Sequence, residues 1–163
     1  MQTIKLSVEN ARKMYPTACA EIKTMLEDSF GKESLKLKVT ERIKTWEDAA
    51  NEMGIDPVTS PPFPIPVGSF QEAANAFFKL DVIATVLLEG VELDWTNEDQ
   101  YKYYAWFNNY KPGSGFSFYD TSYDWTSTNA GGGARLCVDT AEKAEYFGCQ
   151  FIDIFNQFLN PNK

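Results

Sequence analysis

The apolar residues near the start of the chain recur at helical spacing, between recognisable helix start and stop signals. Ser7 is placed to cap a short helix that ends before Pro16. A second helix is expected over residues 17–31, from a Thr cap to a Gly stop. Thr45-Trp-Glu-Asp48 has the pattern of a capping box and predicts a third helix that ends at Gly54. The N-terminal part is therefore expected to be helical.

A proline-rich segment interrupts this pattern. Residues 57–68 contain five prolines, which exclude a helix or a central strand and favour an extended connector. The spacing Pro61-x-x-Pro64 also fits an SH3-type ligand, but a stiff linker is the preferred interpretation. We expect a helical part over residues 1–56, a linker over 57–68 and an α+β part over 69–163, with a single domain as the alternative.

The third part combines an apolar helix with aromatic strands. Residues 69–89 are apolar on most sides, as expected of a helix in the core. Residues 101–125 then hold eleven of the chain's 24 aromatic residues, alternating as strands do. Strands are predicted over 101–108, 115–125 and 134–138, and a helix from residue 139 onward. The predicted fold is α+β: N-terminal helices, a central apolar helix, a three-stranded antiparallel aromatic-rich sheet, and a C-terminal helix packed on it.

The period of two in a strand sorts these aromatic side chains onto two faces. Helices are expected to cover the face that carries Phe116, Phe118 and Leu136. The opposite face then shows five rings and one guanidinium, which could stack on bases, sugars or a partner's side chains. These candidate binding residues are Tyr104, Trp106, Tyr119, Tyr123, Trp125 and Arg135. In the alternative interpretation, the N-terminal helices cover this face and the rings belong to the core.

The composition gives little evidence for catalysis or for metal binding. The chain has no histidine, which excludes His-dependent triads, His-containing zinc sites and the usual proton shuttles. The acidic residues at 94, 98 and 99 lack the ligand spacing of a calcium loop, and residues 131–135 lack the Gly-Lys-Ser/Thr of a P-loop. We therefore predict no catalytic residue, no metal site and no cofactor. An enzyme using carboxylate, lysine or tyrosine chemistry remains a third possibility.

The charge distribution bears on partners and compartment. The net charge is −8: residues 1–44 hold nine Lys/Arg against six Asp/Glu, and residues 45–163 hold six against seventeen. An acidic surface argues against binding of duplex nucleic acid. Three cysteines without a Cys-x-x-Cys pair, no apolar run of about 20 residues and no signal-peptide pattern predict a cytoplasmic protein that does not enter a membrane.

Several segments together resemble a group of small uncharacterised proteins encoded by phages and mobile elements of gut bacteria. The segments that carry the resemblance are 6–11, 39–49, 101–107, 115–118, 134–138, 141–146 and 150–151. The run of three glycines at 131–133 departs from the tighter loop of that group. The resemblance implies an origin in a phage or mobile element, and hence the cytoplasm of a bacterial host, but it implies no activity and no functional residue.

These observations lead to two hypotheses on function. The first is a non-enzymatic accessory protein of a phage or mobile element that acts by binding another macromolecule, with a protein as the expected partner. The alternative is a ligand-binding module whose aromatic sheet face binds single-stranded nucleic acid or glycan. The sequence leaves the oligomeric state open.

Overall fold

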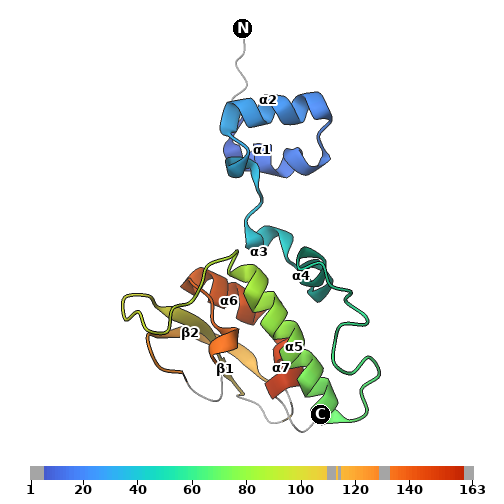
Figure 1. The fold of residues 1–163 in the computed structure, drawn as a ribbon, viewed down its shortest axis with the longest axis vertical. Helices are drawn as coiled ribbons and strands as arrows, with labels where there is room; N and C mark the ends of the chain where they lie inside the picture. The colour runs from blue at the N-terminus through green and yellow to red at the C-terminus, as the bar shows by residue number, and fades with distance from the viewer. Residues whose placement is uncertain (1–5, 110–112, 114, 129–132, 160–163) are drawn as a thin grey trace. The chain divides into compact units, whose positions relative to one another are not determined.

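The computed structural model describes residues 6–109, 113, 115–128 and 133–159, and its ribbon is drawn in Figure 1. The chain divides into two compact units, one up to Arg42 and one from Ile43 onward. The class is α+β, as the sequence predicts. The division falls after residue 42 and not at the proline-rich segment of residues 57–68.

The first unit consists of short helices around a small apolar core. Its elements are α1 (Val8–Met14), η1 (Tyr15–Thr17), α2 (Ala20–Phe30), η2 (Glu33–Leu35) and α3 (Val39–Arg42). Three of its buried residues, Ala11, Leu26 and Leu35, form one apolar cluster, and Val39 of α3 is buried as well.

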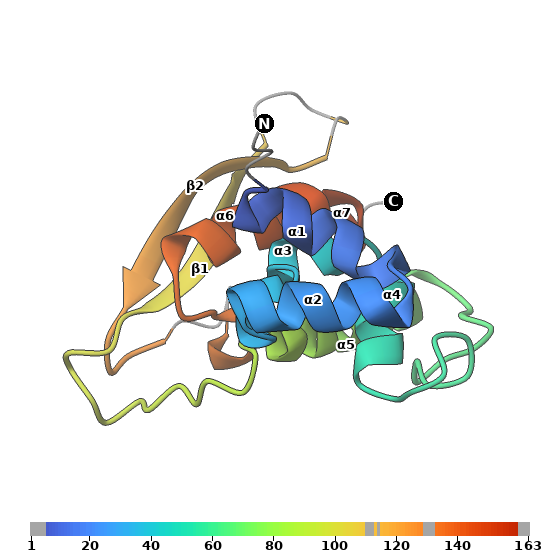
Figure 2. The ribbon, with the colours of Figure 1, turned by 90° about the horizontal axis from the view of Figure 1, so that it is seen from above.

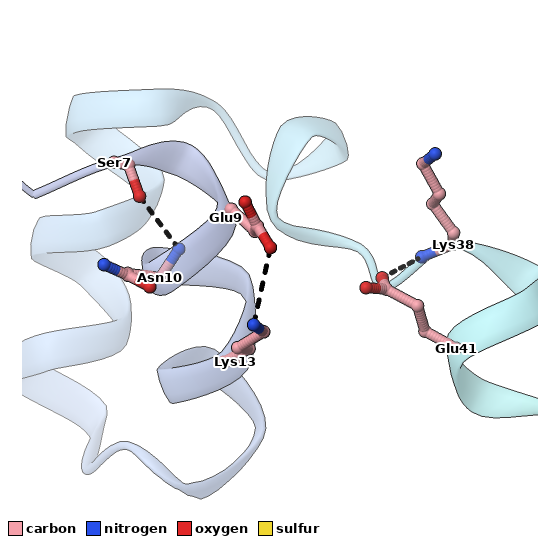
Figure 3. Close-up of polar contacts among 6 residues, drawn as sticks. All are labelled: Ser7, Glu9, Asn10, Lys13, Lys38 and Glu41. Atoms are coloured by element: carbon pink, nitrogen blue, oxygen red, sulfur yellow. Dashed lines mark hydrogen bonds and ion pairs between the residues drawn. The ribbon is translucent and has the colours of Figure 1, made fainter.

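Local capping sets the ends of these helices. Ser7 caps α1 as predicted, because its hydroxyl accepts a 3.2 Å hydrogen bond from the Asn10 N–H (Figure 3). At α3, the Glu41 carboxylate accepts from the Lys38 N–H at 3.1 Å, which satisfies a free donor near the start of that helix. The predicted cap at Thr17 is wrong: α2 begins after Cys19, and the Thr17 hydroxyl donates back to the Met14 carbonyl.

The second unit holds four helices and a hairpin in its described part. The helices are α4 (Trp46–Glu52), α5 (Ser69–Leu87), α6 (Ala141–Gln150) and α7 (Ile152–Leu159). The predicted capping box at Thr45 and Asp48 is present. The single C-terminal helix of the prediction is two helices, because Phe151 leaves the helical conformation with φ −109° and ψ 25°. Figure 1 shows α7 alongside α5, and Figure 2 shows α6 beside the hairpin.

The predicted three-stranded sheet is wrong in its third strand. The sheet has two antiparallel strands, β1 (Lys102–Asn108) and β2 (Ser117–Asp124). Residues 134–136 form the turn η3 (Ala134–Leu136), and only Val138 pairs with β1, exchanging two 2.8 Å hydrogen bonds with Tyr103. Leu136, Cys137 and Val138 are all buried, so this segment does not alternate between faces as a strand of a two-faced sheet would.

The proline-rich segment belongs to the second unit and packs on its helices. Pro61 is buried, and the Trp46 indole N–H donates to the Pro57 carbonyl at 3.0 Å. The Asn75 side chain on α5 accepts from the Phe63 N–H at 2.9 Å and donates to the Phe63 carbonyl at 2.7 Å. These bonds tie the segment to α4 and α5, so it does not form a free linker between two units.

A groove of about 440 Å³ lies along this segment, with Pro57, Phe63 and Pro66 among its lining residues. Two of its polar side chains serve the fold: Asn75 holds Phe63, and the Lys79 ammonium lies 5.9 Å from the Trp46 ring centroid. Glu72 and Gln157 are the other polar side chains of its lining.

Candidate interaction surface on the β hairpin

A β-bulge decides which aromatic side chains share a face. Trp106 pairs with Asp120 and Phe107 with Phe118, so Tyr119 is an extra residue in β2. In an unbroken strand, side chains alternate, so Phe118 and Tyr123 would lie on opposite faces. The extra residue brings them onto the same face. Phe118 pairs with Phe107, and Tyr123 pairs with Tyr103, so both lie on the same face. The prediction that Tyr123 and Trp125 share a face with Tyr104 and Trp106 is therefore wrong.

One face of the hairpin is covered in its middle by α6 and at its turn end by α7. A Cβ atom at Gly148 of α6 would lie 2.7 Å from the Cβ of Ala105, which shows that helix and strand approach closely there. At the turn end of the hairpin, the Phe107 and Phe155 ring centroids are 4.6 Å apart. Both covering helices come from the C-terminal part of the chain, as the sequence predicts for its final helical segment.

At the other end of the same face, four rings form what we call the terminal aromatic cluster: Tyr101, Tyr103, Tyr123 and Trp125. Tyr101 lies 4.7 Å from Tyr123 and 6.0 Å from Trp125, centroid to centroid, and Tyr103 lies 5.7 Å from Tyr123. These are the separations of aromatic rings in contact, so the cluster is a continuous surface and not a cage around an empty centre. Tyr101, Tyr123 and Trp125 are each 44–45% exposed.

The second face of the hairpin carries what we call the open face: Tyr104, Trp106, Asp120 and Ser122. Trp106 is 48% exposed, and its ring centroid lies 6.3 Å from that of Tyr104. Beyond Tyr104 this face is closed, because Lys102 is fully buried. Its ammonium donates to the Asn97 carbonyl at 2.9 Å and lies 5.6 Å from the Trp95 ring centroid. The segment before β1 therefore covers one end of this face and leaves the Trp106 end uncovered.

The structure separates the six predicted site residues into three places. Tyr104 and Trp106 lie on the open face, and Tyr123 and Trp125 in the terminal aromatic cluster. Tyr119 is the bulge residue and is 58% exposed. Arg135 joins neither surface, because it lies in η3 and its guanidinium pairs with Asp81 of α5 at 3.0 Å. Its placement beside the rings depended on the third strand, which does not form.

Sequence reasoning missed Tyr101 and Tyr103 as surface residues. The sequence places Tyr103 on the face that the helices cover, and this is correct. The expectation that helices cover the whole of that face is wrong. The close approach of α6 is at Ala105, and Tyr101 remains exposed. The dense aromatic pattern at both strand ends was the available signal, because a short helix cannot cover every ring of a seven-residue strand.

The electrostatics around the hairpin are strongly acidic. Residues 91–109 and 115–128 carry Glu92, Asp94, Glu98, Asp99, Asp120 and Asp124. Lys102 is the only Lys or Arg in these two ranges, and it is buried. The Thr96 hydroxyl and the Thr96 backbone N–H donate to Asp94 and hold the pKa of that carboxyl below its usual range. The aromatic rings are thus set in a field that repels phosphates and attracts cations.

The described residues offer no metal centre, and the pKa values of two of their thiols are raised. Within them, no three or more Cys, Asp or Glu side chains are grouped so that they could hold a metal ion. Burial, and then the charge of Asp124, raises the pKa of the Cys137 thiol to about 11. The Cys149 residue is exposed, but partial burial of its thiol, and then the charge of Glu145, also raise the pKa of that thiol. No helix within the described ranges has the length and apolar character that crossing a membrane requires.

Comparison with protein-family models, with curated proteins and with solved structures finds no match to this chain. The candidate surface therefore rests on its own geometry: two aromatic surfaces on one hairpin, surrounded by carboxylates.

Proposed function

We propose that the protein is a non-enzymatic accessory protein that binds another protein through the β1–β2 hairpin. The observation that carries the proposal is the terminal aromatic cluster. Tyr and Trp are enriched at protein interfaces because each offers a large apolar area with a polar tip at a small cost in conformational entropy. A role in a phage or mobile element is part of the proposal and rests on the sequence resemblance alone.

The packing of the cluster supports binding in preference to a purely structural role. Its rings contact one another, but three of the four remain nearly half exposed, so the fold does not use their full apolar area. Within the described residues, the hydroxyls of Tyr101, Tyr103 and Tyr123 make no hydrogen bond. A partner could therefore bury the rings and still find donors and acceptors for its own polar groups.

The charge of the hairpin favours a protein over a nucleic acid as the partner. Single-stranded nucleic acid can stack bases on aromatic rings, but it also requires a positive groove for its backbone. The only cation of the described hairpin region is the buried ammonium of Lys102. A neutral glycan would meet no such repulsion, and the experiment below includes it as a competing outcome.

Affinity capture from a bacterial host lysate tests the proposal when three forms of the chain are compared. These are the wild type, the double variant Tyr123→Ala/Trp125→Ala, and the control Phe70→Ala. Phe70 is an exposed ring on α5, 69% accessible, so the control removes similar apolar area from a different surface. We expect one specific protein to be retained by the wild type and the control and to be lost from the double variant.

Two results would contradict the proposal. Equal retention by all three forms would place the interface elsewhere on the chain. Saturable binding to a glycan array or to single-stranded oligonucleotides, lost in the double variant and without any captured protein, would make the hairpin a ligand-binding module instead.

A further inference from the structure

The open face pairs an exposed indole with an exposed carboxylate. Trp106 of β1 stands opposite Asp120 of β2 in the register, so both side chains lie on the same face. Directly opposed residues of an antiparallel pair have Cβ atoms about 5 Å apart. Trp106 is 48% exposed and Asp120 is exposed as well, so a group that lies on the indole would be within reach of the carboxylate.

Further groups on this face extend the indole into a small shelf. The Tyr104 ring lies 6.3 Å from Trp106 at an interplanar angle of 37°, and Ser122 stands opposite Tyr104. Within the described residues, the Tyr104 hydroxyl and the Trp106 indole N–H have no hydrogen-bond partner. The shelf therefore consists of two tilted aromatic rings with a carboxylate on one edge, and the polar tips of both rings are open to a ligand.

No described residue of the hairpin neutralises the charge of Asp120. One of its carboxylate oxygens accepts the Thr121 N–H at 2.8 Å, and no described cation forms an ion pair with it. Lys102, the cation of β1, stands opposite Asp124, and its ammonium is occupied by Asn97 and Trp95. A cation supplied from outside would thus meet an aromatic surface and an uncompensated carboxylate together.

Arginine has the chemistry that fits both groups at once. Its guanidinium is planar, stacks on aromatic rings and presents a fork of N–H donors that matches a carboxylate. Lysine offers a compact and strongly hydrated point charge, which cannot stack in this way. We propose that the open face binds an arginine side chain of the partner, with its guanidinium stacked on Trp106 and paired with Asp120. This inference rests on the proposed function and specifies the partner's chemistry.

The test uses two synthetic peptides of equal charge, acetyl-Gly-Arg-Gly-Arg-Gly-amide and its lysine counterpart. Binding is followed by the fluorescence of a form that retains Trp106 as its only tryptophan. We expect the arginine peptide to bind about tenfold more tightly than the lysine peptide, because only the guanidinium can stack and pair in one geometry. Equal affinities for the two peptides would overturn the inference.

Substitutions separate a local site from diffuse attraction. Asp120→Asn should weaken arginine-peptide binding about tenfold, because it removes the paired charge and keeps the shape of the side chain. Asp99→Asn makes the same change of charge at another exposed carboxylate and should leave binding unchanged. Equal losses in the two variants would show that net charge alone attracts the peptide. Thermal unfolding followed by circular dichroism confirms that both variants fold.

The outcome can be distinguished from failure of the proposed function. If Tyr123→Ala/Trp125→Ala loses a captured protein while neither peptide binds the wild type, the hairpin is a protein-binding surface and the arginine site is wrong. Arginine-selective binding that disappears in Asp120→Asn supports the site, whichever partner the capture experiment finds.

Discussion

Gly148 on α6 lies against the Phe118 ring on β2, so closely that a Cβ atom at position 148 would be 2.6 Å from Cδ2 of that ring. Gly148→Ala should therefore destabilise the protein, although alanine is the better helix former. We expect a loss of about 1–3 kcal/mol in the free energy of unfolding, as overpacked cores show. Urea denaturation measures it.

Cys149→Ala is the matched control, because its side chain is exposed one position further along the same helix. We expect that change to stay within about 0.5 kcal/mol of the wild type. A Gly148→Ala variant that is as stable as the wild type would mean that α6 does not pack on the hairpin in this way.

The exposed rings should contribute far less to stability than the buried ones. Trp106→Ala and Tyr119→Ala should each cost about 1 kcal/mol or less, because half of each ring already lies in water. Phe155→Ala, by contrast, removes a ring that is 4% exposed and should cost about 3–5 kcal/mol. Denaturation of the three variants under one condition checks the contrast. Similar losses for all three would assign Trp106 and Tyr119 to the core.

Tryptophan fluorescence should distinguish exposed from buried rings without substitution of the ring that is observed. In forms with a single tryptophan, Trp106 and Trp125 should emit at long wavelength and be quenched readily by acrylamide. Trp46 is 5% exposed, packs edge-on against Phe78 and donates its indole N–H to Pro57, so its emission should be blue-shifted and protected. Protected emission from both Trp106 and Trp125 would remove the hairpin as a binding surface.

The sequence was sufficient for the parts of the fold that depend on local signals. The Ser7 cap, the Thr45 capping box and the long apolar helix each depend on residues that are close together in the sequence. All three are present where the sequence predicts them. The third strand failed for a non-local reason, since Leu136, Cys137 and Val138 are buried together, which their own alternation does not encode. The sequence correctly predicted that the hairpin is rich in exposed aromatic residues, but it assigned Tyr123 and Trp125 to the wrong face. The reason is the extra residue at Tyr119, which shifts the later residues of β2 to the opposite face from the one that simple alternation predicts.

The thiols should divide into two classes. Cys19 and Cys149 are exposed and should react with a chromogenic disulfide reagent in the native protein. Cys137 is 3% exposed and should react only on unfolding, for a total of three thiols. A total of one in denaturant would indicate a disulfide and contradict the cytoplasmic expectation.

The pKa of Cys137 also predicts a pH dependence of stability. Its thiol has a pKa of about 11 in the folded protein, above the value of 9.0 for an unperturbed thiol. The unfolded chain therefore loses this proton first, and the stability from the neutral buried thiol is present below about pH 9 and lost progressively towards pH 11. Cys137→Ala should show a shallower loss over this interval in urea denaturation. An unchanged slope would mean that the thiol is not desolvated.

Asn75 should be the residue that holds the proline-rich segment in place. Its side chain satisfies both the N–H and the carbonyl of Phe63, so Asn75→Ala leaves two polar backbone groups without partners. We expect a cost of about 1–3 kcal/mol in the free energy of unfolding, and faster cleavage within residues 57–68 by a broad-specificity protease under native conditions. Asn51→Ala, on the exposed side of α4, is the control. Rapid cleavage within residues 57–68 in the wild type would instead restore the interpretation of this segment as a free linker.

Because Tyr119 has no partner in β1, β2 can lose one residue during evolution and still pair with β1. A deletion at position 119 could be absorbed by a regular strand that keeps Phe107 opposite Phe118 and Tyr103 opposite Tyr123. A deletion at position 121 could be absorbed in the same way, but it would place Tyr119 opposite Trp106 and turn Asp120 towards the helices. The terminal aromatic cluster would thus survive either loss of length, whereas the carboxylate beside Trp106 would survive only the first. Related chains that differ in length here should conserve the two surfaces of the hairpin independently.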